Sequence, residues 1–165
     1  MTYYLSIPLM LFLALVEASV LPLFRIGGLQ PNLTLVVLVA WILVRGQKEA
    51  LVLIPVAGIC LGLLGAAAMG SALLAMAPLA LLYDLREVHL GEGQFSLTLL
   101  LTLGATLIYQ IIHLLIYFLF GEAGSWTSAL VGIVLPTALL NLVVAVPVYF
   151  VVWSISGDTR RAAFA

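Results

Sequence analysis

Two long stretches of this chain, residues 95–120 and 125–154, contain no Asp, Glu, Lys or Arg. At 1.5 Å per residue, a helix of either length would exceed the roughly 30 Å hydrocarbon core of a bilayer. Four shorter apolar stretches precede them, so the sequence predicts about six transmembrane helices. The predicted helices cover Tyr4–Leu23, Pro31–Val44, Ala50–Gly65, Ser71–Leu85, Phe95–Phe120 and Ser125–Ser154.

The composition argues against a water-soluble fold. Of the 165 residues, 65% are hydrophobic and 8% are charged, whereas soluble domains carry about 25% charged residues. A membrane β-barrel is excluded because the apolar stretches do not alternate with polar residues. We therefore expect an all-α membrane protein, with one transmembrane helical domain over residues 1–156 and a short cytoplasmic tail over 157–165.

The loop charges predict the orientation of such a bundle. With six spans, five of the six basic residues fall on the side of both termini: Arg45, Lys48, Arg86, Arg160 and Arg161. Only Arg25 falls on the other side. Because cytoplasmic loops carry the excess of Lys and Arg, we expect both termini in the cytoplasm and the protein in the bacterial inner membrane.

Several classes of function are disfavoured by what the chain lacks. A net charge of −1 offers no basic stripe for nucleic acid, and Cys60 is the only cysteine, so no internal disulfide can form. The polar cluster within residues 84–92 is interpreted as a solvated turn. No hydrolase, metalloprotease or phosphate-binding motif is present, so we predict no enzyme activity, no cofactor and no metal.

Glu17 is the most unusual residue, because it lies in the middle of the first predicted helix. A carboxylate exposed to lipid is costly, so Glu17 should face a cavity or a partner, or carry a proton. Arg25 is a conceivable charge partner. The alternative is that this helix ends nearer Pro22, which would leave Glu17 at the interface.

Gln110 and His113 lie three residues apart on the fifth predicted helix and therefore share one face, which Thr102 and Thr106 continue. This polar stripe should point into the bundle. It could line a pocket, or it could hold helices together by hydrogen bonds. Asn141 in the last helix is flanked by Pro136 and Pro147, so a kinked helix could offer its amide and freed carbonyl groups to a partner, or Asn141 could hold helices together.

The third predicted helix carries a stripe of small residues, among them Gly58 and Gly62. Such small-xxx-small spacing permits close approach of a second helix. We interpret this stripe as a packing surface.

Several short motifs resemble the rod shape-determining protein MreD family. Leu21–Phe24 followed by Gly27–Leu33, with its Pro31-Asn32-Leu33 step, is similar to the first loop of that family. Gly46, the Gly-x-x-x-Gly-Leu step at 58–63, Gly70-Ser71 and the Asn141 helix follow in comparable order over nearly the whole chain. One departure is that residues 64–67 lack the Asp that many members carry there.

The resemblance implies a non-enzymatic subunit of the cell-elongation machinery that binds the single-span protein MreC. Through MreC it would be linked to MreB and to the RodA/penicillin-binding protein synthase, with a homodimer possible within the complex. The family is also similar in fold to the S components of energy-coupling-factor transporters, which capture vitamins. An S component is therefore the alternative, and Ala14-x-x-x-Ala18 resembles the motif by which S components dock their coupling subunit.

If the chain is a docking subunit, we expect the first helix, with Glu17, and the Gly-rich third helix to form the surfaces that receive a partner helix. The cost of the carboxylate and the stripe of small residues motivate this hypothesis.

Overall fold

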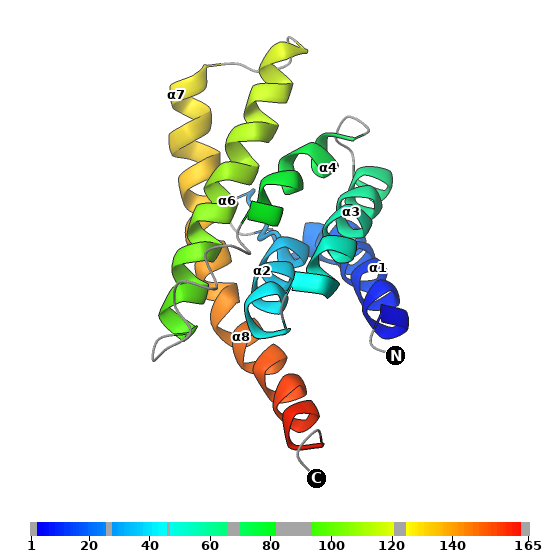
Figure 1. Cartoon of the computed structure of the whole chain (residues 1–165). Coiled ribbons are helices and arrows are strands. Elements are labelled where there is room, and N and C mark those ends of the chain that lie inside the picture. The colour runs from blue at the N-terminus through cyan, green and yellow to red at the C-terminus, as the bar shows by residue number, and fades with distance from the viewer. Residues whose placement is uncertain are drawn as a thin grey trace.

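A computed structural model of the chain describes residues 3–25, 28–45, 47–65, 70–81, 94–120 and 125–162. Every regular element in these ranges is helical, so the predicted all-α class is confirmed (Figure 1). The elements are α1 (Tyr3–Ser19), η1 (Leu21–Phe24), α2 (Leu33–Arg45), α3 (Gln47–Leu64), α4 (Ser71–Met76), η2 (Ala77–Leu81), α6 (Gln94–Leu119), α7 (Trp126–Ala129), η3 (Leu130–Val134) and α8 (Leu135–Ala162). The polar cluster within residues 84–92 lies outside the described residues.

Two stretches among the described residues are long and apolar enough to cross a membrane, Phe95–Leu119 and Trp126–Ile155. The other apolar helices are shorter, at 10–17 residues. At 1.5 Å per residue they extend only about 15–26 Å, which is less than the hydrocarbon core. Two of the six predicted spans therefore meet the length criterion, and the number of spans stays a prediction.

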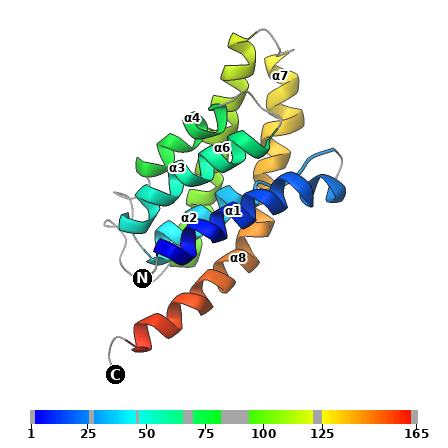
Figure 2. The same cartoon turned by 90° about the vertical axis from the view of Figure 1, so that its right-hand side faces the viewer.

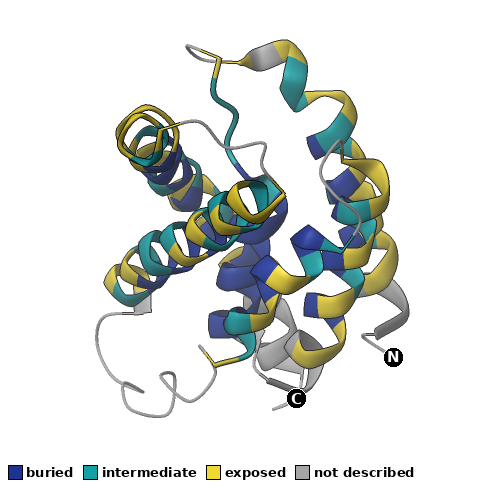
Figure 3. Cartoon of the chain, turned by 90° about the horizontal axis from the view of Figure 1, so that it is seen from above, coloured by how far each residue is buried: buried dark blue, intermediate teal, exposed yellow. Residues whose placement is uncertain are grey.

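The core is built around α2, which packs against α1, α3, α6 and α8. Every residue in 35–44 is at most 8% exposed, and in Figure 3 the buried residues gather at the centre of the molecule. A helix that is apolar on all sides lies in a protein core or spans a membrane, and the burial of residues 35–44 places α2 in the core. Outward-facing side chains of the surrounding helices, such as Phe12, Leu100 and Val143, are more than 60% exposed, and exposed apolar surface of this kind marks contact with other proteins or with a membrane.

The last predicted helix is one continuous rod formed by α7, η3 and α8, and it changes direction along α8 (Figure 2). Its segment η3 is a π-helix that ends two residues before Pro136. Pro136 has no N–H group and cannot donate to the carbonyl four residues earlier. The wider π turn accommodates that missing hydrogen bond.

The small-residue face of α3 is covered by α4 of the same chain. A Cβ atom added to Gly58 would lie 2.8 Å from Leu73 Cα, and one added to Gly62 would lie 3.6 Å from the Gly70 nitrogen. Gly58 is therefore required for the close approach of α3 and α4.

We expect Gly58→Ala to lower the free energy of unfolding by about 1–3 kcal/mol, because the added methyl group meets the backbone of Leu73. Thermal unfolding in detergent would measure the loss. Gly104→Ala is the matched control, since a Cβ there meets nothing within 4 Å and alanine favours the helix. Equal stability of the two variants would contradict the packing role of Gly58.

Candidate functional site

The site is organised by the start of α2, which lies inside the protein. Asn32 precedes the helix, and its side-chain Oδ1 accepts a hydrogen bond from the Leu35 N–H at 2.9 Å. Asn is among the preferred residues at such a cap position because its short side chain reaches the first free N–H groups of the helix. Asn32 is only 8% exposed, so this cap is formed away from solvent.

Two other helices supply acceptors to the same helix start. The Glu17 carboxyl of α1 accepts a hydrogen bond from the Thr34 N–H at 2.7 Å. The side-chain Oδ1 of Asn141, from α8, accepts one from the Asn32 N–H, also at 2.7 Å. The buried start of α2 thus joins α1 and α8.

Asn141 extends this network to α6. Its Nδ2 donates to the Thr106 hydroxyl at 3.0 Å, and that hydroxyl donates to the Thr102 carbonyl at 2.7 Å. Asn141, Thr102 and Thr106 are all fully buried. These residues of the polar stripe of α6 therefore face the interior, where the Thr106 side chain links α6 to α8.

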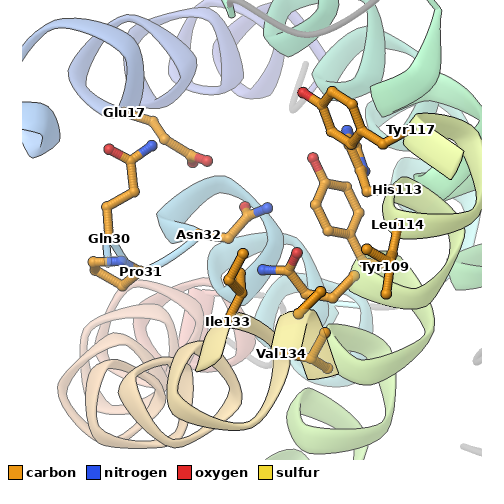
Figure 4. A pocket seen from close by; sticks show the side chains of 12 residues that line it. Glu17, Gln30, Pro31, Asn32, Tyr109, His113, Leu114, Tyr117, Ile133 and Val134 are labelled. Carbon is orange, nitrogen blue, oxygen red and sulfur yellow. The ribbon is translucent and has the colours of Figure 1, made fainter. Parts of the chain in front are cut away.

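A cavity of about 250 Å³ lies beside this network. Figure 4 shows Glu17 on one side of it and the Tyr109 and Tyr117 rings on the other. Its walls come from the end of α1, the segment before α2, α6 and the α7–η3 turn. The lining residues are Glu17, Gln30, Pro31, Asn32, Tyr109, Gln110, His113, Leu114, Tyr117, Ala129, Ile133 and Val134.

Three aromatic rings follow one another along the α6 wall of the cavity. The ring centroids of Tyr109 and His113 are 4.6 Å apart, and those of His113 and Tyr117 are 6.3 Å apart. Their spacing of four residues places all three on one face of the helix. His113 Nε2 lies 3.4 Å from the Ser71 hydroxyl of α4, which holds the imidazole in place.

The polar groups of the site are one carboxyl, amides, hydroxyls and an imidazole, all suited to hydrogen bonding. No group of three or more His, Cys, Asp or Glu side chains that could hold a metal ion occurs among the described residues. No family model, curated protein or solved structure matches the chain. The function of the site is therefore inferred from its geometry and from the sequence motifs.

Four of the candidate residues gather at this site. Glu17, Gln110 and His113 line the cavity, and Asn141 lies in the adjoining network. Arg25, considered as a charge partner of Glu17, is exposed, whereas Glu17 is 8% exposed and bonded to a backbone N–H.

The other two candidates, Gly58 and Gly62, lie against α4. Asn32, Tyr109 and Tyr117 were not among the candidates. A Pro-Asn step before an apolar helix is a capping signal, and it could have pointed to Asn32.

We expect Asn141→Leu to lower the free energy of unfolding by about 1–3 kcal/mol, because the buried Asn32 N–H loses its acceptor. Ser154→Ala, on the same helix, is the control, since the Ser154 hydroxyl is exposed and bonds only to the carbonyl of Phe150 within the helix. Unfolding in detergent would compare the two. A loss as small for Asn141→Leu as for Ser154→Ala would show that the network contributes little.

For substitutions at Glu17, we expect the stability of the protein to depend on whether the new side chain can accept a hydrogen bond, rather than on its charge. Glu17→Gln keeps an oxygen that can accept from the Thr34 N–H, whereas Glu17→Leu removes it. The leucine variant should therefore be less stable than the glutamine variant by about 1–3 kcal/mol. Equal unfolding temperatures for these two variants would contradict the capping role of Glu17.

Proposed function

We propose that this chain is a non-enzymatic integral membrane subunit of the bacterial cell-elongation complex that docks MreC and helps couple MreB to peptidoglycan synthesis. One observation carries the proposal beyond the sequence motifs. Asn32, from the Pro31-Asn32-Leu33 step, and Asn141, from the last helix, belong to the two ends of the MreD resemblance, and they are bonded to each other at 2.7 Å. Two short motifs that are far apart in the sequence thus meet in one hydrogen-bonded contact of the folded chain.

The proposal places the protein in the bacterial inner membrane as a multi-pass protein with both termini in the cytoplasm. The two long apolar stretches, Phe95–Leu119 and Trp126–Ile155, support a membrane location. The start of α1 and the end of α8 both lie in the lower part of Figure 1, an arrangement that fits an even number of crossings.

For the docking of a single-span partner, the structure offers a groove between α6 and α8. The α6–α8 groove has a volume of about 510 Å³, and its lining is apolar except for Ser96. It is formed by Ser96, Leu99, Leu100, Leu103, Leu142, Val143 and Val146. Without a hydrophobic force between helices in lipid, close packing in such a groove is what drives helix association.

We propose this groove as the docking surface in preference to the first and third helices. Glu17 points into the cavity and Gly58 contacts Leu73, so both are occupied within the chain. The S-component alternative also loses support, because Ala14 of its proposed docking motif is 0% exposed.

We expect Leu100→Trp with Val143→Trp to reduce co-purification of MreC by about tenfold or more, which corresponds to ~1.4 kcal/mol of binding free energy. Both side chains are at least 66% exposed, so the larger rings should fill the groove without disturbing the fold. Leu63→Trp, at a residue of α3 that is 62% exposed, is the matched control.

Quantifying MreC against the tagged chain after membrane extraction would measure the effect. An unchanged ratio in the double variant would contradict docking in the α6–α8 groove. Failure of the wild-type chain to retain MreC would contradict the proposed function itself.

A further inference from the structure

The cavity beside α2 contains a carboxyl group and, among the described residues of its lining, no Lys or Arg. Glu17 is 8% exposed and is bonded to the Thr34 N–H. A buried carboxylate is stabilised by N–H donors at a helix start, and a positive charge nearby stabilises it further. The cavity leaves room for such a charge beside Glu17.

The opposite wall of the cavity is suited to a cation. Tyr109, His113 and Tyr117 present consecutive rings along α6, and Figure 4 shows the two tyrosines across the cavity from Glu17. The face of an aromatic ring attracts an ammonium group, and the attraction grows when the cation is desolvated. The cavity thus places a carboxyl group and aromatic rings on opposite sides, the two kinds of group that attract an ammonium ion.

We propose that this cavity binds a small organic cation through its ammonium group, with Glu17 as the counter-charge and Tyr109 and Tyr117 as the aromatic wall. The volume of about 250 Å³ is below the roughly 300–1,000 Å³ of sites for drug-sized ligands, so the ligand has few heavy atoms. An anion would be repelled by Glu17. The site is independent of MreC docking, because the residues that line the cavity and the α6–α8 groove are different.

Choline and 3,3-dimethyl-1-butanol, its uncharged carbon isostere, provide a direct test because they share shape but not charge. Calorimetry on the full-length chain in detergent should show choline binding at least about tenfold more tightly, which corresponds to ~1.4 kcal/mol. Glu17→Gln, which keeps an acceptor for Thr34, should remove this preference. Tyr117→Leu should weaken choline binding, and Ser154→Ala, which lies away from the cavity, should leave it unchanged.

The same ammonium chemistry occurs in lipid headgroups, so a second arm compares nanodiscs of phosphatidylethanolamine with nanodiscs of phosphatidylglycerol. A stabilisation by phosphatidylethanolamine that Glu17→Gln removes, without binding of free choline, supports the proposal and assigns the ammonium group to a headgroup. Two results overturn it. One is choline binding no tighter than its isostere with no Glu17-dependent lipid effect, and the other is a choline preference that survives Glu17→Gln.

Discussion

The structure depends on the satisfaction of the backbone N–H groups at the start of α2. The first N–H groups of any helix have no partner within the helix, and in an apolar interior each unsatisfied group costs several kcal/mol. Because α2 begins inside the protein, water does not supply the acceptors. Asn32, Glu17 and Asn141 supply them instead, from three separate parts of the chain. These bonds link α1 and α8 to the start of α2.

The same requirement explains why the candidate site lies where it does. The side chains that cap α2 are polar and lie in a mainly apolar interior. The cavity lies next to these polar side chains. Glu17 belongs to both, since it accepts from the Thr34 N–H and also lines the cavity. Glu17 therefore both caps α2 and supplies the carboxyl group of the cavity. A substitution that keeps the hydrogen-bond acceptor but removes the charge separates these two roles.

Much of the helical framework could be predicted from the positions of the apolar stretches in the sequence. The prediction of Phe95–Phe120 lies within one residue of α6 at either end, because the flanking residues are polar or Gly-rich and the stretch between them contains no Asp, Glu, Lys or Arg. The stretch from Ser71 was less accurately predicted, since the α-helix gives way to a 3₁₀ helix at Ala77, next to Pro78. The site was harder to predict, because the partner of Glu17 is a backbone N–H that no side-chain pattern reveals. Asn32 and Asn141 are likewise 109 positions apart, too far for helical periodicity to connect them.

The burial of α2 on all sides has a consequence for how the protein is made. The N–H of Asn32, the residue before α2, donates to Asn141, which leaves the ribosome long after α2 itself. Until α8 is synthesised, the Asn32 N–H lacks this acceptor, whereas the Thr34 and Leu35 N–H groups already have theirs in Glu17 and Asn32. The hydrogen bonds at the start of α2 are therefore complete only once the last helix of the chain has been made.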